Sequence, residues 1–133
     1  MNLYELIVES TGTARLDITA TNAVVMQKER VFFEAFAKTK WPKVLSNPKM
    51  LAEATCELRD DECFIGHIQA YEEGKGYGSE LLNYILQYYK AGNIHKFSAY
   101  INNQNAGSRG MFTKAGFTES TKKNNGSFWT MTK

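Results

Sequence analysis

A glycine-rich stretch between an apolar run and an amphipathic segment carries the residues best suited to chemistry. Its residues are Gly74, Lys75, Gly76, Tyr77, Gly78 and Ser79. Glycines allow a backbone to approach a ligand closely. The free N–H groups of a helix's first turn face back into such a loop and bind anions. We therefore predict a loop that binds phosphate or pyrophosphate.

Two common phosphate-binding motifs do not fit this loop. A P-loop requires Gly-x-x-x-x-Gly-Lys-Ser/Thr, whereas Lys75 lies between the glycines. The dinucleotide fingerprint fails because Ser79 stands where its third glycine would be. The glycine spacing on its own is equally compatible with a plain strand-to-helix turn. The rest of the chain must identify the ligand.

The composition describes one globular domain. The chain has 133 residues, 43% of them hydrophobic and 13% aromatic, which suits a single packed core. Sixteen basic residues nearly balance fourteen acidic ones, so nucleic acid is not an expected partner. No apolar stretch is long enough to span a bilayer and no leader is evident, so we expect a soluble cytoplasmic protein. Cys56 and Cys63 are assigned to the core, and no metal site is predicted.

The chain before the loop is predicted to hold four strands and one helix. Alternating and β-branched residues predict strands over residues 3–8, 15–19, 50–58 and 62–71. The first of these would end before Ser10-Thr11-Gly12. Val25, Phe32 and Phe36 recur at helical spacing, which predicts a helix over residues 23–40 that Trp41-Pro42 would end.

The chain after the loop is predicted to continue as helix, strand, short helix and hairpin. The ranges are 79–91, 95–101, 106–115, 117–122 and 127–133. Gly92 and Gly116 are suited to end the helices, and Asn125-Gly126 marks the hairpin turn. A strand, helix, strand order predicts a parallel pair with a right-handed crossover. The fold class is α+β with a mixed sheet.

Two stretches resemble the GNAT superfamily of acyl-CoA N-acyltransferases. Glu73-Gly74-Lys75-Gly76-Tyr77-Gly78 is similar to the family's Arg/Gln-x-x-Gly-x-Gly/Ala loop. The segment from Ala99 to Phe117 resembles the family's strand, Asn, short helix and closing Tyr-x-Lys-x-Gly-Phe. The resemblance implies a mostly antiparallel sheet with a central, splayed parallel strand pair, flanked by helices, in one domain over residues 1–133.

The resemblance also implies acetyl-CoA or coenzyme A as the cofactor. The loop amides would hold its pyrophosphate, and the end of the strand before the loop would pair with the pantetheine arm. The implied cofactor-binding residues are Ile68, Gln69, Ala70, Gly74, Lys75, Gly76, Tyr77, Gly78, Ser79, Asn105 and Phe112.

Three departures from the family pattern bear on activity. Glu73, beside Glu72, stands where the family has Arg or Gln, and a carboxylate repels pyrophosphate unless Lys75 offsets it. Phe112 stands where many members have the tyrosine proposed as general acid. Only two clear strands lie between the first helix and the loop, where the family has three.

Acyl transfer to an amine requires a polarised carbonyl and a route for protons. Strand amides can polarise the carbonyl without a side chain. His67 is the first candidate for the base, because imidazole accepts protons near neutral pH, and Glu57 is the second. Ser108 and Tyr100 are the candidates for the acid. Each of the four is also compatible with a purely structural role.

Two functions from different classes fit the sequence, and the sequence leaves open whether the cofactor carries a different acyl group or serves to modify a nucleobase. The first is an acetyl-CoA-dependent N-acetyltransferase in which an amine of a small molecule or protein attacks the thioester directly, slowly if Phe112 leaves it without an acid. The alternative is a catalytically degenerate GNAT-fold module that binds a protein or nucleic-acid partner. The acceptor cannot be read from the sequence. Aromatic residues on the predicted first helix are compatible with a homodimer.

Overall fold

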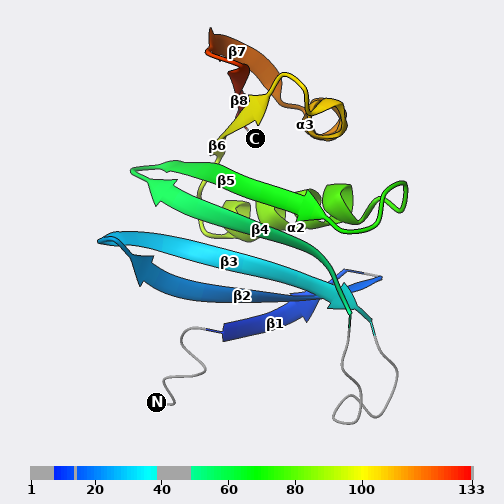
Figure 1. Ribbon diagram of the computed structural model, residues 1–133. Helices are drawn as coiled ribbons and strands as arrows, with labels where there is room; N and C mark the ends of the chain where they lie inside the picture. The colour runs from blue at the N-terminus through cyan, green and yellow to red at the C-terminus, as the bar shows by residue number, and fades with distance from the viewer. Residues whose placement is uncertain (1–7, 14, 39–48, 133) are drawn as a thin grey trace.

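The computed structural model describes residues 8–13, 15–38 and 49–132, which form one mixed eight-stranded sheet with two helices (Figure 1). The strand order is β1-β2-β3-β4-β5-β6-β8-β7. The strands are β1 Val8–Gly12, β2 Leu16–Val25, β3 Lys28–Ala37, β4 Met50–Arg59, β5 Glu62–Ala70, β6 Lys96–Asn102, β7 Thr118–Lys123 and β8 Gly126–Thr132. The helices are α2 Tyr77–Ala91 and α3 Ala106–Ala115.

The segment predicted as the first helix is a β-hairpin, so that prediction is wrong. β2 and β3 pair antiparallel along all ten residues of each strand. Met26 and Gln27 make the turn with φ angles of 53° and 66°, and positive φ at both central residues is what a type I′ turn requires. The predicted stop at Trp41-Pro42 lies outside the described residues.

The error has a physical cause in the burial pattern. Phe33 and Ala35 alternate into the core and are both 0% exposed. The helical spacing had selected Phe32 and Phe36, which lie on the opposite face of the strand. The Met26-Gln27 turn contains no Asn, Asp or Gly, so the local sequence carries none of the residues that usually indicate such a turn. The homodimer hypothesis loses its basis, because it relied on this helix.

The first strands also differ from the prediction. β1 contains Ser10, Thr11 and Gly12, before which the first strand is predicted to end, while residues 3–7 lie outside the described part of the chain. The predicted strand at 15–19 is confirmed and extends to Val25. The sheet therefore has more antiparallel strands before the glycine loop than the sequence predicted. The apparent shortage relative to the family is corrected.

The remaining elements are confirmed within one or two residues. α2 packs on one face of the sheet and lies behind β4 and β5 in Figure 1. Its apolar face inserts Leu81, Leu82, Ile85 and Leu86, all 0% exposed, against the inward side chains of β2 to β5. No helix in the described residues is long and apolar enough to cross a membrane.

Two irregularities in β5 shape the region beside the glycine loop. β5 and β6 pair in parallel only as far as Ile65 and Ala99, although both strands continue beyond these residues. The ladder with β4 shifts at the same point, because Cys56 pairs with Ile65 and Thr55 with His67. Gly66 is therefore the extra residue of a β-bulge.

Candidate active site

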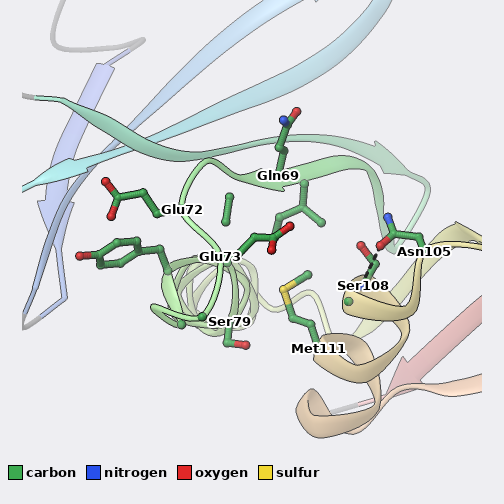
Figure 2. Close-up of a pocket in the computed structure, with 14 residues that line it drawn as sticks. Gln69, Glu72, Glu73, Ser79, Asn105, Ser108 and Met111 are labelled. Carbon is green, nitrogen blue, oxygen red and sulfur yellow. Dashed lines mark hydrogen bonds between the residues drawn. The ribbon is translucent and has the colours of Figure 1, made fainter.

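A cavity of 590 Å³ lies between the glycine loop and α3 (Figure 2). The end of β5, the loop and the first turns of α2 and α3 form its walls. The lining residues are Ile68, Gln69, Ala70, Glu72, Glu73, Gly74, Gly76, Tyr77, Gly78, Ser79, Asn105, Gly107, Ser108 and Met111. Nine of the eleven predicted cofactor-binding residues are among them, and only Lys75 and Phe112 are not.

The loop has the backbone that anion binding requires. Gly74 and Gly76 have φ angles of 74° and 79°, a region that side chains rarely adopt. Gly76 is the N-cap of α2, and no side chain caps the helix there. The N–H groups of the first turn, from Tyr77 to Ser79, are therefore left for a ligand on the cavity wall.

Gly78 brings the helix close to its neighbours. A Cβ atom at Gly78 would lie 3.1 Å from Met111 Sδ and 3.5 Å from the Cβ of Ala70. The first of these is tighter than ordinary van der Waals contact, so Gly78 allows α2, α3 and β5 to converge on the cavity. Met111 contributes apolar surface to the same wall (Figure 2).

Charges around the loop are partly compensated by distant residues. Lys49 Nζ lies 2.7 Å from Glu72 Oε1, and this hydrogen bond holds the pKa of Glu72 below its usual value. Figure 2 shows the carboxylate of Glu72 directed away from Met111 and Ser108, whereas the carboxylate of Glu73 lies on the side of the loop that faces Met111. Glu73 is thus the carboxylate that an anionic ligand would meet.

The start of α2 is tied to the β1–β2 turn through Glu80. Arg15 Nε lies 2.7 Å from Glu80 Oε1, and Thr13 Oγ1 donates a hydrogen bond to the same carboxylate. Burial acts to raise the pKa of Glu80, but Thr13 and Arg15 outweigh it and the net pKa is lowered. Arg15 also stacks on the Tyr77 ring, 4.8 Å from its centroid, which adds a positive charge beside the loop.

A second cavity of 240 Å³ opens where β5 and β6 separate, and we call it the wedge. Gly66 and His67 line it from β5, Tyr100 and Ile101 from β6, and Phe112 from α3. Ile68, Asn105 and Ser108 line both the wedge and the cavity at the loop. The two hollows therefore adjoin one another, from the glycine loop to the splayed strands.

His67 is the predicted base that borders the wedge. It lies on β5, and Nε2 is 3.4 Å from Glu53 Oε1 on β4. The bulge at Gly66 makes this contact possible, because the extra residue turns His67 to the same sheet face as Phe64 and Glu53. A carboxylate beside one imidazole nitrogen orients the ring and leaves the other nitrogen for a proton.

The other predicted base and one predicted acid are engaged elsewhere. Glu57 lies near Lys28 and Arg59, at 3.5 and 3.4 Å, and does not line the wedge. Burial acts to raise its pKa, but these cations outweigh it and lower the pKa, which weakens Glu57 as a base. The hydroxyl of Tyr100 donates to the carbonyl oxygen of Lys123 at 2.8 Å, on the β7 side of the strand.

The residues of α3 that the sequence predicts to bind the cofactor or to act as the acid lie at the start and in the first turns of that helix. The side chain of Asn105 caps α3 by accepting a hydrogen bond from the Ser108 N–H at 3.0 Å (Figure 2). Ser108 lines both cavities, so its hydroxyl is the predicted acid nearest their junction. Phe112 is 2% exposed, packs edge-to-face on Phe117 with ring centroids 4.9 Å apart, and borders the wedge.

Several residues at the site carried no recognisable signal in the sequence. Arg15 and Lys49 are far from the loop along the chain and reach it only through the folded sheet. Glu53 belongs to the site through its pairing with Gln69 and its contact with His67. Cross-strand register brings these groups together, and register cannot be read from residue types alone.

A family comparison identifies the domain. Residues 27–117, more than half of the chain, match the model of the acetyltransferase (GNAT) family. The chain belongs to the GNAT family. The matched range extends from β3 through α3 and contains the glycine loop and the wedge of this GNAT domain. No curated protein matches the chain.

Solved structures share the GNAT fold at low sequence identity. PaiA N-acetyltransferase from Thermoplasma acidophilum, solved with coenzyme A, has a TM-score of 0.67 and 15% identity over 78% of this chain and 61% of its own. PseH N-acetyltransferase from Campylobacter jejuni, solved with acetyl coenzyme A, has a TM-score of 0.62 and 15% identity, and the match covers 78% of this chain and 68% of PseH. The ribosomal-protein-S18-alanine N-acetyltransferase from Escherichia coli has a TM-score of 0.59 and 16% identity, and the match covers 77% of this chain and 68% of that protein. The chain thus spans less than two thirds of the first of these proteins.

Proposed function

We propose that this GNAT domain is an acetyl-CoA-dependent N-acetyltransferase. One observation carries the proposal. The pairing of β5 and β6 ends at Ile65 and Ala99, and the wedge that opens there adjoins a loop whose helix amides are uncapped. A site with an anion-binding loop at one end and a strand opening at the other suits a long ligand with a diphosphate and a thioester.

The chain offers matching partners along such a ligand. The amides from Tyr77 to Ser79 would bind the pyrophosphate. Beyond Ile65, the edge of β5 facing β6 has no strand partner in the described residues, so the backbone of Ile68 to Ala70 would pair with the pantetheine amides as an added strand. Gly66, as the bulged residue beside the wedge, would direct backbone toward the acyl carbonyl.

Proton transfers would use side chains at the wedge. Acetyl-CoA, when bound, would supply an acetyl thioester for transfer to the acceptor nitrogen, with the coenzyme A thiol as the leaving group. His67, oriented by Glu53, would accept the proton that the nitrogen loses. Ser108 or water would protonate the departing sulfur, because Phe112 has no hydroxyl to offer.

A substitution in the glycine loop tests the proposal. Gly76→Glu places a carboxylate and a strained φ at the N-cap of α2, while Gly110→Glu places the same side chain on exposed α3, where nothing lies within 4 Å of a Cβ atom. A saturating ligand raises the melting temperature by several degrees, since binding at about 100 times Kd contributes about 2.7 kcal/mol. We expect coenzyme A and acetyl-CoA to stabilise the wild type and the Gly110 variant.

We expect the Gly76 variant to lose this response while circular dichroism shows that it remains folded. Thiol release with a panel of amines then tests for transfer. Stabilisation by coenzyme A without transfer to any amine would favour the degenerate binding module, and equal stabilisation of all three proteins would overturn the assignment of the loop.

A further inference from the structure

The sheet face opposite α2 carries several charged side chains around His67, of which the proposed transfer chemistry uses only Glu53. No described helix covers this face over β3, β4 and β5, which is turned toward the viewer in Figure 1. Two hollows of 350 Å³ and 490 Å³ lie on it. Phe32, Thr55 and His67 line both, and His67 also lines the wedge. An acceptor reaching the wedge from this face must therefore pass these hollows.

The first hollow is cationic. Arg30 and Arg59 line it with Glu57, and Lys28 lies 3.5 Å from the Glu57 carboxylate, so three cations surround one anion. Arg30 Nε is buried and has no hydrogen-bond partner among the described residues. The guanidinium of Arg59 stacks on the Phe64 ring at 3.9 Å and approaches Glu57 only to 3.4 Å. Positive charge and unused donors remain for a second anion.

The second hollow is anionic. Glu34 and Glu53 lie directly opposite each other on β3 and β4 and both line it. Like charges at opposed positions of a ladder repel, so the pair favours a cation between them. Tyr71 forms a hydrogen bond to Glu53, which raises the pKa of the tyrosine. His67, 3.4 Å from Glu53, lies where the two hollows meet.

We propose that this face is the acceptor site and that it selects an amine carrying an anionic group at its other end. The inference rests on the proposed transferase function and names its substrate class. The ammonium of the incoming acceptor lies by Glu34 and Glu53, and the anion is held by Arg30 and Arg59. His67, between them and beside the wedge, deprotonates the amine for transfer.

The strand register sets the length of the acceptor. Glu34 pairs with Glu53, and Arg30 pairs with Glu57, four residues away along the same two strands. Four residues along a strand span about 13 Å. The long arginine side chains shorten this span. An acceptor with a few carbons between amine and anion therefore bridges the two ends, whereas a bare alkylamine leaves the buried donor of Arg30 unused.

A matched series of acceptors tests the charge preference. γ-Aminobutyrate, its neutral amide γ-aminobutyramide, putrescine and aminopropylphosphonate share a primary amine and differ in the far group. We expect kcat/KM to be at least about tenfold higher for the two anionic acceptors than for the amide, the scale of one charge-assisted hydrogen bond. Comparing kcat/KM for γ-aminobutyrate with kcat/KM for aminopropylphosphonate shows whether the site prefers a carboxylate or a phosphonate. Equal rates with the amide, or a preference for putrescine, would overturn the proposal.

Substitutions show whether the preference for an anionic acceptor comes from the two arginines on this face or from the overall charge of the protein. Arg59→Gln and Arg30→Gln should raise KM for γ-aminobutyrate about tenfold while leaving the KM for its amide unchanged. Lys122→Gln on exposed β7 removes the same charge far from this face and should change neither value. An anionic preference that survives both arginine substitutions contradicts the assignment.

A binding measurement keeps this inference separate from the proposed function. The backbone amide resonances of Arg59, Gly66 and His67 are followed as γ-aminobutyrate or γ-aminobutyramide is added, with no turnover required. Shifts with the acid alone would support the acceptor site even if no transfer occurred, and the transferase proposal would then fail by itself. Transfer to amines without selective shifts would overturn the acceptor site and leave the transferase proposal intact.

Discussion

His67 Nε2 lies 3.4 Å from Glu53 Oε1 across the β4–β5 ladder, at the point where β5 bulges and leaves β6. The contact exists because Gly66 adds one residue to β5 and so changes which face the following side chains take. The same bulge that ends the regular ladder with β4 thus turns the imidazole toward a carboxylate.

This relationship predicts a paired effect on the rate. His67→Gln should lower kcat by about 10²-fold or more, the usual contribution of one acid–base group, with little change in the affinity for coenzyme A. Glu53→Gln should lower kcat less, because it removes the group that orients His67 and leaves the base itself in place. Steady-state kinetics at several pH values would check this. A variant of His67 with an unchanged pH profile would exclude it as the base.

The inward direction of Glu73 predicts a gain of affinity on its removal. Glu73→Gln should tighten coenzyme A binding at least about fivefold, because two charges about 5 Å apart near a surface interact by about 1–3 kcal/mol. Glu72→Gln is the control, since Glu72 points away and is paired with Lys49. Calorimetric titration at low and high salt would check this. The gain should shrink with added salt, and equal gains in both variants would contradict a specific role for Glu73.

The position of Phe112 predicts a faster enzyme on adding a hydroxyl. Phe112 borders the wedge, so Phe112→Tyr has room to direct its hydroxyl there and should raise kcat at least about tenfold. Phe117→Tyr is the matched control, because Phe117 is also 2% exposed but lines neither cavity. A buried hydroxyl without a partner costs about 1–3 kcal/mol, so the control should lose stability without gaining rate. An unchanged kcat in the Phe112 variant would mean that water suffices as the proton donor.

The contacts of Glu80 predict a pH-dependent contribution to stability. The pKa of Glu80 in the folded protein is below the ordinary value of 4.5. At pH values between the folded pKa and 4.5, the unfolded state therefore binds more protons than the folded state. The contribution is complete above about pH 4.5 and disappears as the pH falls through the folded pKa. Glu80→Gln should cost about 1 kcal/mol at neutral pH and progressively less in acid. Urea unfolding at a series of pH values would check this, and a cost independent of pH would contradict the assignment.

The local parts of this protein could be read from its sequence. The glycine loop, α2 and α3 and the final hairpin follow from signals within a few residues, such as Gly76 at a left-handed position and Asn105 at an N-cap. These features depend on backbone sterics and helical periodicity, which a short segment contains in full. Most of the residues that line the cavity at the loop were therefore predicted together with the elements that present them.

The sheet face around His67 was decided only by the tertiary structure. The β2–β3 hairpin replaced a predicted helix, because burial of Phe33 and Ala35 against α2 outweighs the helical spacing of Phe32 and Phe36. The bulge at Gly66 and the early end of the β5–β6 ladder set which side chains meet His67. Both depend on cross-strand register, and register is fixed by contacts between residues distant in the chain, so no single segment contains it.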